Sequence, residues 1–276
     1  MNAPSRTRRI LWSLLFITLV ITWLAPVLWM FNTAFKPDAF IFQRPPTWIA
    51  PEWTLKHFRE VIADWPFLIW VMNSTLVAGG ATALSLLVSI PAAYSFARMR
   101  WNGRNLLFII MVTSMLIPWQ VNVIPLYFFM NELNLLDTRV AIMLPIAAMP
   151  VGVFLLRQFF INIPRELEEA SVLDGCSSFG TLWRVIIPIS VPAIAALAIY
   201  QFVFTWNEFF WSIIALSSEE RYTVPIGLRA LQGSYDIQYG LLMAGAALAS
   251  LPVLLVYLVL QRQIISGITM SSAEFK

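Results

Sequence analysis

The sequence predicts an all-α membrane protein with six transmembrane helices and a polar helix–turn–helix segment between the fourth and the fifth. Composition is the first observation: 59% of the 276 residues are hydrophobic and 12% are charged, about half the charged share of soluble domains. The second is that the apolar residues form six long runs separated by polar connections. The third is residues 164–192, where six charged residues stand between two apolar runs.

The first apolar run, Ile10–Phe31, contains no charged residue and follows three arginines in residues 1–9. At about 1.5 Å per residue, a helix of this length crosses a hydrocarbon core of about 30 Å. A signal peptide is the alternative, but its apolar region is shorter and leads to small residues. Because this run leads into bulky side chains, we expect an uncleaved span.

Residues 32–67 form a polar, proline-rich connection, which indicates irregular backbone. Thr54 is a candidate cap for a short amphipathic helix at the membrane surface. His57 falls on the polar side of that helix, and we expect it to be solvated or interfacial and not a ligand. Since the chain has one histidine and one cysteine, Cys176, we expect no metal site, because zinc usually takes three or four such ligands.

Five further runs are expected to span the membrane, and with the first they make one domain over residues 10–262. The second run contains Asn73 among small residues, which allow close helix packing in lipid. Residues 263–276 are expected to be a tail. The five runs are Leu68–Phe96, Leu106–Met130, Val140–Phe160, Ile186–Leu216 and Tyr239–Leu260.

The basic residues predict the orientation of these spans. Six spans put both termini on one side, and that side holds eleven of the 18 basic residues. The short turn 98–104 alone holds three arginines, and short loops count most in the positive-inside rule. We therefore expect both termini, residues 1–9 and 263–276, and the loop 161–188 to lie in the cytoplasm.

The loop 161–188 reads as two short helices separated at Asp174-Gly175. Glutamates after Pro164 favour a first helix, and Gly175 suits a left-handed residue that ends it. Ser177 or Ser178 then caps the next helix. A charged, ordered element between membrane spans indicates a surface on which another protein docks.

The stretch EEASVLDGCSSFGTLWRVIIPISVP resembles the EAA loop of ABC importer membrane subunits. Glu169-Ala170-Ser171 matches the triplet of that loop, Asp174-Gly175 matches its Asp-Gly pair, and Pro188 and Pro192 match its two prolines. Further segments are similar to carbohydrate-importer permeases of the maltose type, over nearly the whole chain. They are Phe35-Lys36-Pro37-Asp38, Asn73-Ser74, Ala97-Arg98, Thr205–Phe209 and Ser266–Thr269.

The resemblance implies a permease subunit that translocates a carbohydrate or a related polyol. It implies a second, similar permease subunit, two cytoplasmic ATPase subunits and an external solute-binding protein as partners, in a bacterial or archaeal cytoplasmic membrane, with no nucleic acid. The chain has no phosphate-binding GxxxxGK[ST] loop, so we expect no enzyme activity and no bound cofactor, with ATP and magnesium on the partner. The residues expected to couple to the ATPase are Glu168, Glu169, Ala170, Ser171, Asp174, Gly175 and Pro188.

The substrate pathway is a second set of candidates. Glu208 is an ionisable group in a predicted span, which favours a functional role, although a position near the outer interface is the alternative. Asn207, Asn73, Gln120 and Asn122 offer hydrogen bonds to a sugar, but interhelical packing uses the same residue types. A stand-alone secondary transporter and an ABC importer of a non-sugar solute remain alternatives, and a membrane enzyme would need catalytic residues clustered at one depth, which the sequence does not show.

Overall fold

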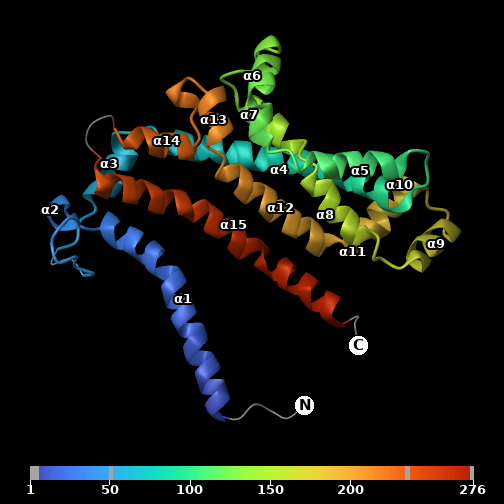
Figure 1. The fold of residues 1–276 in the computed structure, drawn as a ribbon, viewed down its shortest axis with the longest axis horizontal. Coiled ribbons are helices and arrows are strands. Elements are labelled where there is room, and N and C mark those ends of the chain that lie inside the picture. Colours follow the sequence, from blue (N-terminus) through green and yellow to red (C-terminus); the bar gives the residue numbers. More distant parts are fainter. Residues whose placement is uncertain (1–5, 50–51, 234–236, 274–276) are drawn as a thin grey trace. The chain divides into compact units, whose positions relative to one another are not determined.

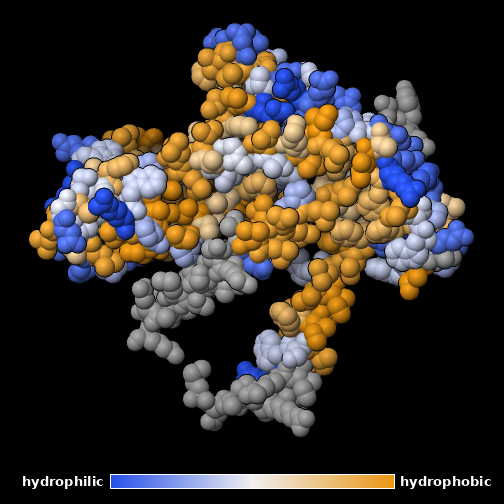
Figure 2. Space-filling view, turned by 180° about the vertical axis from the view of Figure 1, so that it is seen from behind, coloured by the Kyte–Doolittle hydropathy of each residue, from blue (hydrophilic) through white to orange (hydrophobic). Residues whose placement is uncertain are grey.

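The computed structural model describes residues 6–49, 52–233 and 237–273, and every regular element within them is helical (Figure 1). The chain forms two compact units, Met1–Leu68 with Gly227–Leu251, and Ile69–Ile226 with Pro252–Lys276. Four helices of the described part are long and apolar enough to cross a membrane, or six if each of two bent helix pairs is one span. Apolar side chains make up much of the surface in Figure 2, as expected of helices that contact lipid.

The first unit contains the amino-terminal helices. The long helix α1 is apolar and mostly exposed from Leu11 to Leu28, with the Trp23 side chain 80% exposed, whereas Thr33 and Ala34 at its end are buried. The helices of this unit are α1 (Arg6–Ala34), α2 (Asp38–Ile41), α3 (Lys56–Ala63), most of α14 (Val224–Leu231) and the first part of α15 (Tyr239–Ala273).

His57 lies in the core of the first unit, so the prediction that it is solvated was wrong. Its Nε2 lies 3.0 Å from the Lys36 carbonyl oxygen. A Cβ atom at Gly240 would lie 2.3 Å from the same nitrogen, so only glycine allows α15 to pass this close. The turn after α1 covers the polar side of α3, and this long-range contact could not be read from the helical periodicity of α3.

The second unit contains the remaining helices. At one end of this unit lies α9, which contacts α10 and the π-helix Leu182–Ile186 (Figure 1). Its elements are α4 (Phe67–Arg98), α5 (Arg104–Ser114), η1 (Trp119–Asn122), α6 (Val123–Glu132), α7 (Arg139–Ala147), α8 (Val151–Phe160), α9 (Arg165–Leu173), α10 (Ser178–Thr181), the π-helix η2 (Leu182–Ile186), α11 (Ile187–Ile189), α12 (Val191–Trp206), α13 (Phe210–Ala215) and η3 (Glu219–Arg221).

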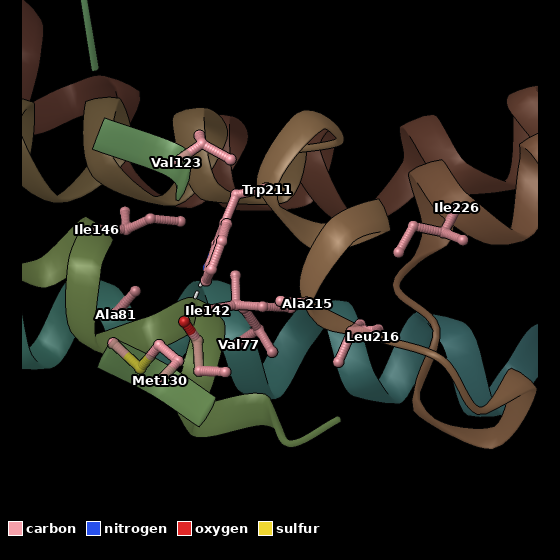
Figure 3. Close-up of a cluster of buried hydrophobic side chains, with 11 residues drawn as sticks. Val77, Ala81, Val123, Met130, Ile142, Ile146, Trp211, Ala215, Leu216 and Ile226 are labelled. Atoms are coloured by element: carbon pink, nitrogen blue, oxygen red, sulfur yellow. Dashed lines mark hydrogen bonds between the residues drawn. The ribbon is translucent and has the colours of Figure 1, made fainter. Parts of the chain in front are cut away.

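Two clusters of buried apolar side chains hold the second unit together. In the first, Trp211 of α13 lies among residues of α4, α6 and α7, and its indole N–H donates to the Ala141 carbonyl over 2.8 Å (Figure 3). The second joins α4, α8 and the π-helix through residues such as Ala97, Phe160 and Ile186. This second cluster supports the end of the unit at which α9 begins.

Two predicted spans are not continuous helices. In the third run, α5 and the η1–α6 segment meet at 92°, at a break before Pro118, which has no amide N–H to donate. In the fifth, α12 meets the preceding helices at 79° and ends at Trp206, so the run to Leu216 is interrupted after that residue. The fourth run is confirmed as one candidate span, Arg139–Phe160.

The last helix, α15, continues past the predicted start of the tail. The run predicted as the sixth span, Tyr239–Leu260, is closely matched by the candidate span Tyr239–Val259. The backbone stays helical to Ala273, and residues 274–276 of the predicted tail lie outside the described residues, as do residues 1–5 of the predicted amino-terminal segment.

Candidate functional site

The candidate site is the segment 161–189, built on the charged helix α9. Pro164 stands at the N-cap with φ −56° and ψ 136°, and Glu166 and Glu168 occupy the first turn. Carboxylates in the first turn interact favourably with the positive end of the helix dipole. Four of the first five residues of α9 are charged and bury little apolar surface. The favourable interaction of the carboxylates with the helix dipole helps to explain why this segment is still helical.

The turn after α9 is closed by glycine and by backbone hydrogen bonds. Gly175 has φ +81°, in the left-handed region that glycine adopts at low cost. The Cys176 amide donates to the Ser171 carbonyl over 2.9 Å, and the Gly175 amide donates to the Val172 carbonyl over 3.0 Å. These two bonds make a Schellman motif, which satisfies carbonyls at the end of a helix.

Ser177 begins the next helix, since its side chain accepts a hydrogen bond from the Gly180 amide over 3.2 Å. The helix then widens into the π-helix η2, in which the Ile187 amide donates to the Leu182 carbonyl. Pro188 follows directly, and a proline ring in a helix clashes with the carbonyl four residues before it. The π-helical turn and Pro188 together form the segment that connects α10 to α12.

The inner face of α9 is held by Glu168 and Ser171. The Ser171 hydroxyl donates to the Glu168 carbonyl over 2.8 Å and lies 2.7 Å from the Thr181 hydroxyl, both in buried surroundings. Arg98 Nε of α4 lies 2.8 Å from Glu168 Oε1, with the two side chains 5% and 19% exposed. Burial raises the pKa of Glu168 above its ordinary value, against the opposing effect of Arg98 and Arg165.

The outer face of α9 and its turn is exposed. It presents Glu169, Ala170, Asp174 and Gly175, and the adjacent Leu173 side chain is 88% exposed. An open groove of about 530 Å³ runs along this helix. It is lined by Arg98, Arg165, Glu168, Glu169, Val172 and Leu173. The predicted coupling residues thus divide between two faces, which the sequence did not distinguish.

The contact of Arg98 with Glu168 was missed by the sequence reasoning, in which Arg98 served only for the orientation and as part of the resembling pair Ala97-Arg98. One of its terminal nitrogens also donates to the Ile163 carbonyl, just before α9. The partner residues lie 65 and more positions away, so no local pattern indicates these contacts. The only available signal was an arginine at the end of an apolar run.

The second candidate region surrounds Asn207 and Glu208, at the break between α12 and α13. Glu208 is 7% exposed, and its carboxylate accepts hydrogen bonds from the Trp211 and Ser212 amides over 2.8 and 2.9 Å. The Ser212 hydroxyl donates to it as well, over 2.7 Å. The carboxylate therefore caps the first turn of α13.

Asn207 and Glu208 also line an open cavity of about 700 Å³. Its other walls are mostly aromatic and aliphatic. Asn207 is exposed, and its amide donates to the Val203 carbonyl over 2.8 Å. The lining residues besides these two are Trp119, Ile199, Tyr200, Val203, Phe204, Phe209 and Phe210.

The other predicted pathway residues lie in two places. Gln120 and Asn122 are exposed on η1, the short helix that carries Trp119 of the cavity wall. Asn73 is fully buried on α4, donates to the Glu220 and Tyr222 carbonyls, and accepts from Arg139 Nε over 2.9 Å. All of its described contacts hold the loop after α13 and the start of α7.

Among the described residues, no group of three or more histidine, cysteine, aspartate or glutamate side chains is arranged to hold a metal ion. The Glu208 carboxylate accepts from backbone amides and a hydroxyl, and Glu168 is paired with Arg98 by charge. The structure thus has an exposed surface with charged and apolar side chains on α9, and a largely apolar cavity beside α12.

Comparisons with known proteins agree on one family. Residues 67–269 match the family described as binding-protein-dependent transport system inner membrane component. The arabinooligosaccharides transport system permease protein AraQ of Bacillus subtilis is 35% identical over 205 residues, covering 74% of this chain and 73% of that protein. The sulfoquinovosyl glycerol transport system permease protein SmoH of Agrobacterium fabrum is 31% identical over 253 residues, covering 91% and 89%.

A solved structure is also similar. One chain in the crystal structure of a bacterial ABC transporter involved in the import of the acidic polysaccharide alginate matches with a TM-score of 0.81 and 25% identity. The match covers 95% of this chain and 99% of that chain. The chain therefore belongs to the family of inner membrane components of binding-protein-dependent transport systems.

Proposed function

We propose that the chain is one of two similar membrane subunits of an ATP-driven importer, and that α9 is the surface on which an ATPase subunit docks. In this proposal the chain crosses the membrane six times, with each bent helix pair as one span. Both termini and the loop 161–188 lie in the cytoplasm. The other partners are two ATPase subunits, which bind ATP and magnesium, and an external solute-binding protein.

The observation that carries the docking proposal is the division of α9 into two faces. Its inner face is occupied by buried contacts of Glu168 and Ser171. Its outer face leaves the Glu169 carboxylate, the small Ala170 and the apolar Leu173 free for another protein. An exposed apolar side chain beside charges is typical of an interface, in which apolar anchors are surrounded by polar groups.

The turn at Asp174-Gly175 and Pro188 would give this surface its rigidity. The turn is closed by two backbone hydrogen bonds, and Pro188 fixes one backbone angle where the loop enters α12. When two ATPase subunits close on ATP, a rigid docked helix would be displaced as a body. Such rigid-body motion is an established way to convert a ligand-driven change into a rearrangement of packed helices.

A carbohydrate or related polyol is the proposed substrate. The named relatives transport an arabinooligosaccharide and a sulfoquinovosyl glycerol. The cavity beside α12 offers aromatic faces, which suit the apolar faces of sugar rings, and Asn207 offers a polar group. Because Glu208 already accepts three hydrogen bonds, we propose that it shapes this cavity and that Asn207, Gln120 and Asn122 supply the polar contacts.

Charge reversal on the outer face of α9 tests the docking proposal. In Glu169→Arg, a carboxylate that meets a cation on the ATPase becomes a like charge, and we expect the amount of ATPase that co-purifies to fall about tenfold or more. ATP-driven uptake in proteoliposomes should fall with it. Glu166→Arg is the matched control, since it reverses the same charge in the same helix, away from the groove.

Equal retention of the ATPase by Glu169→Arg and the wild type would contradict docking on this face. A stand-alone secondary transporter is the alternative function. It would take up solute in proteoliposomes with an ion gradient and no ATPase, whereas the proposed importer requires ATP, the ATPase and the binding protein together.

A further inference from the structure

We infer that Arg98 is a positioning residue that links the docking helix α9 directly to the membrane-spanning helix α4. This inference rests on the proposed docking of an ATPase on the outer face of α9. It concerns the inner face of α9. The chain already connects α9 to the membrane helices through the loop 161–188, and Arg98 would add a second, non-covalent connection.

Arg98 holds α9 at two points. It is the last residue of α4, and its Nε lies 2.8 Å from Glu168 Oε1, in the first turns of α9. A terminal nitrogen of the same guanidinium donates to the carbonyl of Ile163, just before the helix begins. The contact with Glu168 is an ion pair without hydrogen-bond geometry, and the contact with Ile163 is a hydrogen bond, so the guanidinium ties the start of α9 to the end of α4 at two points.

The pair is largely shielded from water, which makes it different from an ordinary surface ion pair. The Arg98 and Glu168 side chains are 5% and 19% exposed. Exposed pairs contribute little, whereas removing one member of a buried pair leaves a charge without compensation. A displacement of α9 that broke this contact would therefore be opposed, so α9 and the end of α4 should move together.

The end of α4 transmits such a displacement to other membrane helices. Ala93 and Ala97, next to Arg98 on α4, belong to the buried cluster that includes Leu156 and Phe160 of α8. Alanines bring the helix backbones close together, and closely packed helices transmit displacement. Arg98 thus joins α9 to a packed part of the second unit that is distant from it in sequence.

The neighbouring arginines differ from Arg98 and supply a control. Arg100 lies two residues later in the same basic turn and is exposed. Arg104 donates to the Met99 carbonyl within the turn itself, over 2.8 Å. Among the described ion pairs, Arg98 is the arginine that reaches a carboxylate of α9.

The test measures solute transported per ATP hydrolysed, at equal amounts of purified permease–ATPase complex in proteoliposomes with the binding protein. We expect Arg98→Ala to retain the ATPase, because Glu169, Ala170 and Leu173 of the outer face are unchanged, and to lower this ratio about tenfold, a usual size for coupling between sites. Arg100→Ala should keep the wild-type ratio. The charge-exchanged double variant Arg98→Glu with Glu168→Arg should recover part of the loss.

Two milder variants keep the test decisive if Arg98→Ala yields no complex. Glu168→Gln and Arg98→Lys preserve the size of the side chains but weaken the paired geometry, and both should lower the ratio. A purely structural role would lower the yield of complex and leave the ratio unchanged, which would overturn the inference. So would an equal loss in Arg100→Ala.

Failure of the proposed function gives a different result. A wild-type chain that binds no ATPase and shows no ATP-dependent uptake would contradict both the proposed function and this inference. A wild-type complex that transports, together with an Arg98→Ala complex of normal ratio, would contradict only the role of Arg98.

Discussion

Ser171 shows how one hydroxyl determines which face of α9 is turned inward. It stands where the resembling loop has alanine, and its hydroxyl lies 2.7 Å from that of Thr181 on the following helix. Since the Ser171 hydroxyl gives its hydrogen to the Glu168 carbonyl, the Thr181 hydroxyl is the donor between the two. The contact fixes α9 against α10 and leaves Glu169 outside.

Removing this hydroxyl should weaken the loop without changing its outer face. In Ser171→Ala the buried Thr181 hydroxyl loses a partner, and we expect the free energy of unfolding to fall by about 1–3 kcal/mol. Reversible unfolding in mixed micelles measures this change. Ser178→Ala, which removes an exposed hydroxyl from the same loop, should stay within about 0.5 kcal/mol of the wild type, and an equal loss there would contradict the explanation.

Gly175 and Gly240 show that two glycines are needed for different physical reasons. Gly175 has a φ of +81°, but a Cβ there would meet no atom within 4 Å, so its requirement is conformational. At Gly240 the requirement is space, because a Cβ would lie against the His57 ring. The first role could be read from the sequence as a helix end, whereas the second depends on a contact between distant segments.

Among the elements, the turn before α7 fastens the loop after α13. The Ser217 and Ser218 amides donate to one Asp137 oxygen over 2.9 and 3.0 Å, and the Ser218 hydroxyl donates to the other. The Asp137 amide in turn donates to the Ala215 carbonyl over 2.8 Å. Two loops that are about 80 residues apart are thereby held together.

Acid should loosen this contact. Burial alone would raise the pKa of Asp137, but the hydrogen bonds from Ser218 and Ser217 outweigh it and hold the pKa below its ordinary value of 3.8. A carboxyl with a lowered pKa in the folded state stabilises it fully above the ordinary value, and the stabilisation is lost as the pH falls through the lowered pKa.

Asp137→Asn should therefore show a smaller loss of unfolding temperature than the wild type as the pH falls from about 5 to about 3. Thermal unfolding in detergent over this range measures the difference. Asp64→Asn is the control, because it removes the same charge at an exposed position. Parallel acid profiles for Asp137→Asn and the wild type would exclude this carboxylate as a source of acid sensitivity.

The element boundaries could be predicted where local chemistry determines them. Gly175 lies in the turn that ends α9, and Ser177 caps the next helix, as their residue types indicate. The breaks before Pro118 and after Trp206 were not predicted, because the runs that contain them are long and mostly apolar despite a few polar residues near each break. Proline occurs inside α1, α4 and α15 without a break, so proline alone does not identify one.

At the scale of the whole molecule, hydrophobicity does not distinguish the core from the lipid-facing surface. Trp211 is fully buried and bonded to Ala141, whereas Trp23 of α1 is 80% exposed. In water these two environments would select different residues, but in lipid both favour apolar side chains. This is why the sequence predicted the spans and the charged loop but not the inner face of α9 or the cavity beside α12.

The proposed orientation makes a final prediction, which the small number of thiols makes easy to test. Cys176 is the only cysteine, so Cys176→Ser gives a background without thiols. In that background Asn102→Cys places a thiol in the exposed arginine turn, and Ser218→Cys places one in the exposed loop after α13.

A membrane-impermeant maleimide should label Ser218→Cys in intact cells, and Asn102→Cys only after the membrane is permeabilised. The reason is that the proposed orientation places the short turn 98–104, with its three arginines, on the cytoplasmic side, and the proposed topology puts an odd number of spans between this turn and the loop after α13. Labelling of Asn102→Cys in intact cells would reverse the orientation and place α9 outside the cell, where no ATPase could reach it.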